Sequence, residues 1–542
     1  MERRKFIQIS ALSSASTLFL NGHQIKAFSK TNLVDVIPSN IIDGRSLVMI
    51  QLSGGNDGLN TLIPINQYDD YANLRPTTKI KNSGTNAGIQ LDSTLANEDQ
   101  IMLHPSLTGF KSLYDAGKLR IIHNVGYPRI NKSHFAARAL MFNGGDGTPE
   151  NSTKTSGWMA RFLNSGYDYN DYLDPLGIQL GNKKPSLGFH SEHEHKVDVN
   201  LTKQDVSGYY NIISNLGNPL PESIPTSDFG NNIKFIGATE SATNSYSQRI
   251  SEVFNTGSNS TVNYPDFDLA DQLKTVAKMI KGGSKTKIFL VHIGGFDTHA
   301  DQVESTENSH IGKHAELLTE VAESVKAFQD DITALGIDDK IVTTTFTEFG
   351  RKPVENGNLG TDHGNLGPMF VIGTHIKGGI SGSNLNLSEV TKHFDETKMQ
   401  YDYRQIFSTV ITDFLGANSN VLAGTEFEDF DGDKKMDLIT ESQIANIDHI
   451  VPNTEPNNSL TVLPNFIEEE FSLKFVSESM QRAYIVLYNL NATIVFQSPQ
   501  DFVSGINLIQ NINIGHLTQG HYILAIKSAN NNTLNKTRII KK

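Results

Sequence analysis

The chain has 542 residues, of which 37% are hydrophobic, and this length suits a large catalytic domain plus a smaller one. A formal net charge of -13 at pH 7 argues against nucleic-acid binding, because nucleic-acid binders carry basic stripes. The sequence contains no cysteine, which excludes disulfides, thiol catalysis and cysteine-ligated zinc, so any metal must be held by Asp, Glu, His, Asn, Ser or Thr.

Residues 1–29 are predicted to be an export signal. A basic start (MERRKFI) precedes the short apolar stretch Ile9–Leu20, and Ala27–Ser29 offers a small-residue cleavage site. The apolar part is too short to cross a bilayer. The RRKFI pattern is similar to a twin-arginine signal, which exports folded proteins, and the alternative is an ordinary signal with two arginines. Either interpretation takes the mature protein out of the cytoplasm, and no later segment reaches the length of a transmembrane helix.

The first buried strand is predicted at Ser46–Leu52, which is apolar and ends in the glycine-rich stretch SGGNDGLNT. Glycines let a backbone turn sharply there and approach a ligand closely. We expect Asp57 to reach a metal from the end of this strand. The alternative is that Asp57 only hydrogen-bonds its own backbone in a turn. We favour the metal-ligand interpretation because the other candidate ligand sites accompany it.

A second strand is predicted at Leu119–Val125, and it is followed by the stretch NKSHFAARAL. Ser133 stands where a helix would begin, and serine is favoured as an N-cap. The amide donors and positive dipole end of a helix N-terminus also favour an anionic group or an alkoxide beside a metal. Both roles for Ser133, helix cap and nucleophile, stay open.

Two further strands are predicted at Lys287–His292 and Ile341–Phe346, separated by an amphipathic helix at His310–Leu335. This β-α-β order predicts a parallel sheet, whose strands all end at the same edge. His310 and His314 lie four residues apart on the helix, but they lack an acidic partner and we place them on the surface. Residues 196–285 are mostly polar and helical in pattern, and we interpret them as a cap or insertion.

Acidic and imidazole side chains follow these strand ends. Asp297 and His299 come after a Gly-Gly turn, and Glu348 follows the next strand. A Gly/Asn-rich loop then delivers Asp362 and His363. Carboxylates and imidazoles brought together suit a divalent metal. The stretch HSEHEH at residues 190–195 also looks like a metal cluster, but no apolar run flanks it, so we interpret it as a surface loop.

The C-terminal part begins with an acidic turn that carries Asp429, Asp431, Asp433 and Asp437. Alternate carboxylates around a glycine turn can wrap one calcium ion, but the spacing lacks the last acid of an EF-hand. Calcium binding and a solvated acidic turn both remain open. Residues 451–465 are rich in Pro, Asn and Thr, which indicates a linker.

Short alternating runs follow the linker and predict a small β-sandwich. These runs are Phe471–Phe475, Ala483–Tyr488, Thr493–Phe496, Gly505–Ile509 and Tyr522–Ile526. The stretch GHYIL and the terminal TRIIKK resemble the type A sorting domain of the type IX secretion system, over residues 466–542. The resemblance implies delivery to the cell surface or medium of a Bacteroidetes-like bacterium. A carbohydrate-binding sandwich is the alternative, but the segment has few aromatic side chains that look exposed.

Seven segments in order resemble the DUF1501 family over roughly residues 45–420: LVMIQLSGGNDGLNT, LHPSL, NKSHFAA, GWMARFL, GGFDTHADQ, TEFGR and GTDHG. This family is a twin-arginine-exported group placed in the alkaline phosphatase/sulfatase-like superfamily. The resemblance implies an α/β fold with an alkaline phosphatase-like, mostly parallel sheet, helices on both faces and a metal site at the C-terminal strand ends. Members of the superfamily typically hold two metals and hydrolyse or transfer phosphate or sulfate esters.

Carried over by motif, the resemblance implies Ser133 as nucleophile and a set of metal ligands: Asp57, Asp297, His299, Glu348, Asp362 and His363. Glu348-Phe349 stands where members of the superfamily usually have Asp-His, so the second metal site lacks a histidine ligand. Asp362 would compensate for that lost ligand. An oxygen-rich second site suits Mg, Mn or Ca better than Zn. Arg351 or Arg129 would clamp the anion, and His134 or His104 would move protons.

The sequence therefore predicts an export signal (1–29), a DUF1501 domain (45–420), an acidic turn and linker (421–465) and a sorting sandwich (466–542). The leading hypothesis is an exported hydrolase of phosphate or sulfate esters with one or two divalent ions. The alternatives are a non-enzymatic surface protein that binds glycans or partners, and a metalloprotein whose ions only brace loops. The expected partners are an anionic ester and the export machinery, without nucleic acid and without an integral membrane span.

Overall fold

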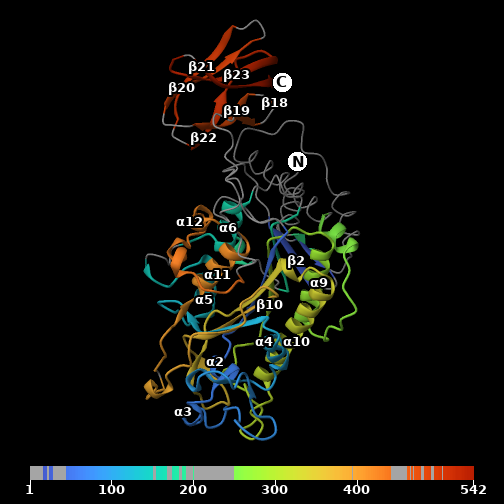
Figure 1. The fold of residues 1–542 in the computed structure, drawn as a ribbon, viewed down its shortest axis with the longest axis vertical. Coiled ribbons are helices and arrows are strands. Elements are labelled where there is room, and N and C mark those ends of the chain that lie inside the picture. Colours follow the sequence, from blue (N-terminus) through green and yellow to red (C-terminus); the bar gives the residue numbers. More distant parts are fainter. Residues whose placement is uncertain are drawn as a thin grey trace, which may run out of the picture. The chain divides into compact units, whose positions relative to one another are not determined.

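A computed structural model describes the chain at residues 16–20, 23–28, 44–149, 154–167, 174–181, 186–190, 199–200, 249–393 and 395–440, and at 460–541 apart from 464–465, 468, 478–480, 490–492, 503–504 and 531. The chain forms two compact units, Met1–Ile447 and Asp448–Lys542, which we describe separately (Figure 1). Among the described residues, no helix combines the length and the apolar character needed to cross a bilayer.

An eleven-stranded mixed sheet forms the centre of the first unit. Its strands lie in the order β15 (Gly379–Ser381), β7 (Leu119–Gly126), β14 (Gly367–Ile372), β11 (Ile341–Phe346), β3 (Ser46–Leu52), β10 (Ile288–Ile293), β8 (Gly177–Leu180), β2 (His23–Phe28), β1 (Ser16–Leu20) and β9 (Val199–Asn200), with β16 (Tyr401–Asp402) paired to β7. The central neighbours β11, β3, β10 and β8 are parallel, whereas β14 and β2 run opposite to the strands beside them. The ends of β3, β10 and β11 therefore meet at one edge.

Helices cover both faces of this sheet (Figure 1). Alternate side chains of β3 belong to different core clusters, which explains why both faces of the sheet are covered. Val48 and Ile50 belong to one cluster, and Leu47 and Met49 belong to the other. Strands buried on both faces read as continuous apolar runs. The first cluster includes residues of α4 (Thr108–Asp115), α9 (Asp268–Lys281) and α10 (Lys313–Ala334), and the second includes residues of α5 (His134–Asn143), α6 (Trp158–Gly166), α11 (Tyr403–Thr409) and α12 (Ser419–Thr425). The predicted α/β class with helices on both faces is confirmed.

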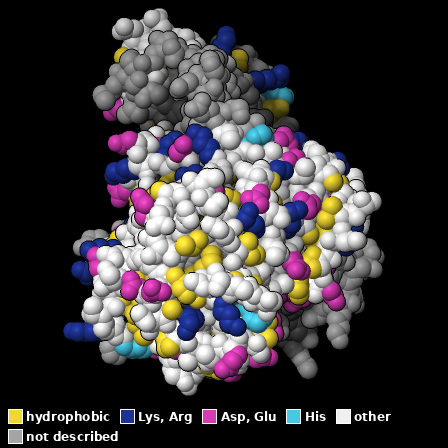
Figure 2. Space-filling model, turned by 60° about the horizontal axis from the view of Figure 1, so that its bottom comes forward, with side chains coloured by type: hydrophobic (Ala, Val, Ile, Leu, Met, Phe, Trp, Pro, Cys, Tyr) yellow, Lys and Arg dark blue, Asp and Glu magenta, His cyan; other side chains and the backbone are white. Residues whose placement is uncertain are grey.

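Smaller elements surround the ends of the central strands. Strands β12 (Arg351–Glu355) and β13 (Thr361–His363) form an antiparallel pair in which Arg351 lies opposite His363. A three-stranded sheet and two short helices complete this end of the unit: β4 (Leu62–Pro64), β5 (Ile89–Gln90), β6 (Ile101–Leu103), α2 (Gly58–Thr61) and α3 (Tyr68–Leu74). On the face seen in Figure 2, acidic and basic side chains of the described residues are interspersed among hydrophobic ones, so neither charge sign dominates it.

Two predictions for the region before β11 are wrong. The helix expected at His310–Leu335 begins only at Lys313, after Gly312, and His314 is 1% exposed instead of lying at the surface. Within the expected cap at 196–285, helix α9 is a core helix, because Leu269, Leu273 and Val276 share one face and pack onto the sheet. Residues 196–198 and 201–248 of that stretch, and residues 191–195 of the HSEHEH cluster, lie outside the described residues.

Most of the predicted export signal also lies outside the described residues. Within residues 1–29 the structure describes β1 and β2, which pair with each other, and β2 also pairs with β8. The signal itself stays a prediction.

The second unit consists of two sheets that share one core. One sheet has the order β17 (Leu460–Leu463), β19 (Glu470–Ser477) and β22 (Gly505–Asn513), and the other has β18 (Phe466–Ile467), β24 (Thr533–Lys541), β23 (Gly520–Ser528), β20 (Gln481–Tyr488) and β21 (Ile494–Phe502). Phe475, Ile485 and Leu524 lie in the shared core. The predicted strands appear with longer bounds. Strands β17, β18 and β24 were not predicted: β17 lies within the expected linker at residues 451–465, and the polar residues of β24 dilute the apolar alternation.

Candidate metal centre

Loops that follow the sheet strands meet at one edge of the first unit. Asp297 and His299 lie in the loop after β10, Glu348 follows β11, and His363 ends β13. His134 opens helix α5 after the chain leaves β7. The carboxyl ends of parallel strands in an α/β sheet form the usual ligand crevice.

Three of these side chains form a compact group. Ligand atoms of His134, Asp297 and His363 all lie within 4.8 Å of one another, and this is the one such group found among the described residues. His134 Nε2 lies 3.3 Å from Asp297 Oδ2, and His363 Nε2 lies 3.1 Å from Asp297 Oδ1. Ligand atoms around a tetrahedral zinc ion are separated by about 3.3 Å. The spacing of the three side chains therefore fits a divalent ion.

His299 adds a third imidazole to this group. Its Nε2 atom lies 3.3 Å from Asp297 Oδ1 and 2.9 Å from His363 Nε2. Its other nitrogen, Nδ1, lies 2.9 Å from Asp362 Oδ1. A carboxylate behind a ligating histidine fixes the ring and its tautomer. Asp362, expected as a ligand, instead orients His299, and Asn356 donates to the same oxygen at 3.2 Å.

Glu348 also lies behind a histidine. Its Oε1 atom accepts the Gly54 N–H at 3.0 Å and lies 2.9 Å from His134 Nδ1. This leaves His134 Nε2 directed at Asp297, so His134, expected to move protons, takes the position of a ligand. His134 Nε2 and Glu348 Oε2 are buried and have no hydrogen-bond partner among the described residues. Buried polar atoms are rarely left unsatisfied, so these atoms fit a site that holds an ion.

The electrostatics keep the central carboxylate charged. Desolvation alone would raise the pKa of Asp297, but hydrogen bonds from Arg351 and His363 hold that pKa well below its usual range. The hydrogen bond to Glu348 raises the pKa of His134, and desolvation lowers the pKa of His363. Phe349 packs beside the histidines, with its ring centroid 4.5 Å from that of His363 and 4.9 Å from that of His134.

Arg351 does not form the anion clamp that we expected. The residue is 4% exposed, and its guanidinium donates to Asp297 Oδ1 at 2.8 Å. The remaining bonds go to backbone carbonyls, namely those of Gly54, Gly55, Phe296 and Thr361. Because nearly all its donors are used inside the protein, Arg351 ties together the loops after β3 and β10 and strand β13. Its role is to position Asp297.

Asp57 is not part of the metal group, contrary to our expectation. Its carboxylate forms a two-point ion pair with Arg75, at 2.5 and 2.8 Å, and also accepts from Gln302 at 2.6 Å. Burial would raise the pKa of Asp57, but Arg75 outweighs it and the pKa is lowered. No sequence pattern indicated Arg75, since it stands alone between a helix and Pro76. His104 is buried beside this network, with its ring 5.9 Å from that of His314.

Ser133 lies at the N-cap of α5, next to His134, and is exposed. Its hydroxyl makes no capping bond, and no hydrogen bond to it is found among the described residues. Asn131 Oδ1 instead accepts the Ser133 backbone N–H at 2.8 Å. The capping role is therefore absent, and the hydroxyl is free beside the metal group.

Two of the four acids of the predicted calcium turn have separate partners, and the other two lie in separate turns. Asp431 accepts from Ser419 Oγ at 2.6 Å and from the Gly432 N–H at 2.7 Å, and Asp437 pairs with Lys377 at 2.5 Å. Asp429 and Asp433 lie in separate short 3-10 turns. In the described part of the chain these carboxylates do not form a metal-binding group, so the calcium prediction is not supported.

Comparisons with known proteins agree with two of the sequence resemblances. Residues 270–422 match the family model described as protein of unknown function (DUF1501), and residues 461–542 match the secretion system C-terminal sorting domain. One similar solved structure is described as "Metabolism of multiple glycosaminoglycans by bacteroides thetaiotaomicron is orchestrated by a versatile core genetic locus". The match covers 91% of this chain and 89% of the chain in that structure, with 8% sequence identity. Its TM-score is 0.29, which is too low to support an argument.

No curated protein matches the chain. The sorting-domain match indicates an exported protein of the cell surface or medium. Asp297, His299, Glu348 and His363 fall inside the DUF1501 match, whereas His134 lies before it. Most of the candidate metal centre thus lies in the segment that matches the DUF1501 model, and a separate segment matches the sorting-domain model.

Proposed function

We propose that this protein is an exported, metal-dependent hydrolase of phosphate or sulfate esters, with an alkaline phosphatase-like domain. The observation that carries the proposal is the convergence of His134, Asp297 and His363, with His299 beside them, at the carboxyl ends of parallel strands. Ligand sites of α/β enzymes lie at this edge. The sorting domain supports delivery through the periplasm to the surface or medium, and a twin-arginine signal would bring the chain to the periplasm.

His134, Asp297, His299 and His363 would hold a single divalent ion. Three imidazoles and one carboxylate suit Zn or Mn. When bound, such an ion polarises the oxygens of an ester and lowers the pKa of a nearby hydroxyl or water. A second ion would need the Asp57 carboxylate as a ligand, but this carboxylate is paired with Arg75. The site would therefore hold one ion only.

Ser133 is the proposed nucleophile. Its exposed hydroxyl adjoins His134 at the start of a ten-residue helix, where amide donors favour an anion. The serine oxygen forms a bond to phosphorus or sulfur as the bond to the alcohol oxygen breaks, and the alcohol leaves with the serine proton. Water then cleaves the seryl ester and restores the serine.

Arg138 is the proposed partner of the ester's anionic oxygens in place of Arg351. It lies one turn along α5, where its Nε atom donates to the His134 carbonyl at 3.1 Å. No other hydrogen bond of its guanidinium is found among the described residues. A planar guanidinium with free donors binds phosphate and sulfate oxygens at two points.

The test combines metal analysis with an activity screen. The full-length secreted protein is assayed with p-nitrophenyl phosphate and p-nitrophenyl sulfate in the presence of Zn, Mn, Mg or Ca. We expect Asp297→Asn to lose both bound metal and hydrolysis. Asp301→Asn is the matched control, because Asp301 is an exposed acid in the same loop, at φ 54, a conformation that asparagine tolerates. Wild-type protein that binds no metal would overturn the proposal.

One observation favours the alternative of a non-enzymatic surface protein. Arg351, which was expected to bind the anionic oxygens of the substrate, instead donates its hydrogen bonds mainly to backbone carbonyls. Stoichiometric metal binding without hydrolysis of either ester would select this alternative.

A further inference from the structure

The carboxylate of Glu396 joins the two loops that carry His134 and His363. Its Oε1 atom forms an ion pair with Lys132, which stands two residues before His134. Its Oε2 atom accepts the backbone N–H of Asn365 at 3.2 Å, two residues after His363. One side chain therefore holds together two segments that each supply a histidine to the metal group.

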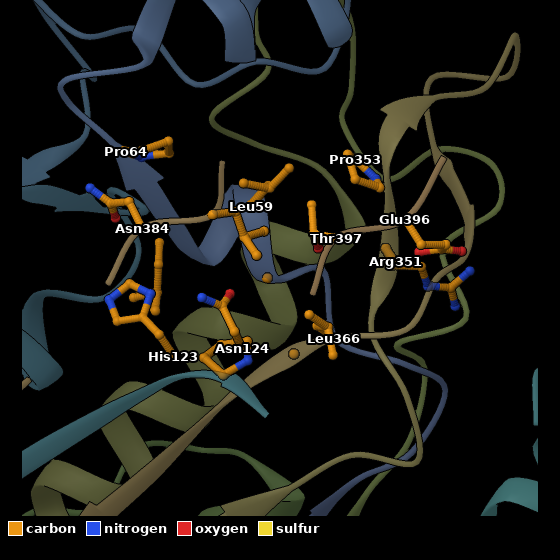
Figure 3. Close-up of a pocket in the computed structure, with 15 residues that line it drawn as sticks. Leu59, Pro64, His123, Asn124, Arg351, Pro353, Leu366, Asn384, Glu396 and Thr397 are labelled. Atoms are coloured by element: carbon orange, nitrogen blue, oxygen red, sulfur yellow. The ribbon is translucent and has the colours of Figure 1, made fainter. Parts of the chain in front are cut away.

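Strand pairing brings Glu396 to this place. The residue lies in the loop before β16, and β16 pairs in parallel with the last two residues of β7. The chain runs from that end of β7 toward Lys132, which is 264 residues from Glu396 in the sequence. Glu396 and Arg351 both line a small pocket, whose other side is formed by His123 (Figure 3). Arg351 in turn bonds Asp297 of the metal group.

The backbone of Lys132 fixes the orientation of His363. The Lys132 carbonyl oxygen lies 2.7 Å from His363 Nδ1. Because a carbonyl oxygen only accepts, Nδ1 of the neutral ring must carry the proton, and Nε2 keeps its lone pair. That Nε2 atom lies 3.1 Å from Asp297 Oδ1 and 2.9 Å from His299 Nε2. The position of Lys132 thus decides whether His363 can present Nε2 to an ion.

The pair of Lys132 with Glu396 is more enclosed than another ion pair of the same region. The two side chains are 39% and 17% exposed, whereas those of Lys398 and Glu389, which lie 3.7 Å apart, are 87% and 52% exposed. Ion pairs in water contribute little, and their contribution rises as solvent is excluded. The enclosed pair can therefore restrain the loop that continues into Ser133.

We infer that Glu396 is a positioning residue of the metal centre. Through Lys132 and Asn365 it holds the ring of His363 with Nε2 facing the ion, and it holds Ser133 beside that ion. Glu348 and Asp362 bond the rings of metal-group histidines directly, whereas Glu396 acts through the backbone. The inference rests on the metal ion of the proposed function, but it does not require that the protein hydrolyse an ester.

The first test measures the affinity of the full-length protein for Zn or Mn by competition with a chelator. We expect Glu396→Ala to weaken metal binding about tenfold, because groups that orient a ligand have effects of this size or larger. Glu396→Gln keeps an acceptor for the Asn365 N–H and loses only the ion pair, so it should weaken binding about two- to fivefold. Lys132→Met should have the same effect, and the two changes combined should cost no more than either alone.

The matched control is Glu389→Ala, which removes the more exposed ion pair and should bind metal like wild type. Wild-type metal affinity in Glu396→Ala would overturn the inference, even if the variant melted at a lower temperature, because Glu396 would then only stabilise the fold.

A second test needs no metal and separates this inference from the proposed function. The ¹⁵N chemical shifts of the His363 ring distinguish its two tautomers, and they are measured in metal-free protein at about pH 8, where an ordinary histidine is neutral. Wild type and Glu389→Ala should carry the proton on Nδ1, and Glu396→Ala should carry a substantial share of it on Nε2. If wild-type protein binds no metal, the proposed function fails and this measurement decides the inference: an unchanged tautomer in Glu396→Ala would overturn it.

Discussion

Arg75 and Asp57 form a two-point ion pair, with Nη1–Oδ2 at 2.5 Å and Nη2–Oδ1 at 2.8 Å, and both side chains are wholly buried. Arg75 also donates to the carbonyls of Lys352 and Pro353 on β12. The pair therefore joins the turn after β3 to the β12–β13 pair that carries His363. Its role is to brace the loops of the metal centre.

Removing one partner of this pair should destabilise the protein strongly. We expect Arg75→Met to lower the free energy of unfolding by about 3–5 kcal/mol, because it leaves the Asp57 carboxylate buried and unpaired. Lys111→Met is the control: Lys111 pairs with Asp115 at a much more exposed site, where loss of the pair should change stability by less than about 1 kcal/mol. Urea unfolding measures both. Equal effects of the two substitutions would contradict the bracing role.

Asp362 should tune metal affinity without being a ligand. Asp362→Asn removes the carboxylate that orients His299, and we expect metal affinity to fall about 10- to 100-fold, because supporting groups of this kind have effects of that size. Competition with a chelator of known affinity measures the change. The Asp301→Asn control should bind metal like wild type. Complete loss of metal from Asp362→Asn would instead identify Asp362 as a direct ligand.

Gly54 holds the backbone of the metal loop close to β3. It has φ 127, and a Cβ there would overlap the Asp297 backbone nitrogen and lie 2.6 Å from the Phe296 carbonyl carbon. We expect Gly54→Ala to displace Asp297 and to weaken metal binding by about tenfold or more. Gly84→Ala is a matched control, because Gly84 has φ 82 but no atom within 4 Å of such a Cβ. The control should cost about 1–2 kcal/mol of stability and keep its metal. Similar metal affinity in both variants would refute the close-contact argument.

Two buried histidines should make the protein less stable in acid. Desolvation lowers the pKa of both His123 and His314 from 6.5 to about 4. Between these values the unfolded chain binds protons that the folded chain does not, so stability is complete above pH 6.5 and is lost as the pH falls toward 4. Each group contributes up to roughly 3 kcal/mol.

Melting temperatures at several pH values between 4 and 8 test this expectation. His123→Leu and His314→Leu should each show a smaller fall in stability on acidification than wild type. His521→Leu should keep the wild-type pH dependence, because its histidine is exposed. An unchanged pH dependence in both buried variants would contradict the assignment.

Much of the sheet could be predicted from local patterns. The bounds of β3 and β11 were predicted correctly, and β10 was displaced by one residue, because buried parallel strands are short apolar runs bounded by turns. The ends of these strands identified Asp297 and His299, which the structure brings together with His363. Helix starts were less certain: Gly312, at φ 122, delays α10 until Lys313.

The partners of each charged side chain could not be predicted in the same way. Glu348 looked like a ligand, but it bonds His134, which is 214 residues away in the chain. Arg351 looked like an anion clamp, but three of the four carbonyl groups that surround it, those of Phe296, Gly55 and Gly54, come from loops 55 to 297 residues distant. A polar side chain that follows a strand can find its hydrogen-bond partner on any segment that packs against it in the folded protein.

The sequence by itself determined the α/β pattern, the β-rich tail and the acidic and imidazole side chains at the strand ends, because hydrophobic periodicity and turn chemistry act over a few residues. Only the tertiary structure decided that Asp57 pairs with Arg75, that His134 joins the metal group and that His123 faces a pocket. These outcomes depend on which distant segments meet, and burial then requires each polar group to find a partner there.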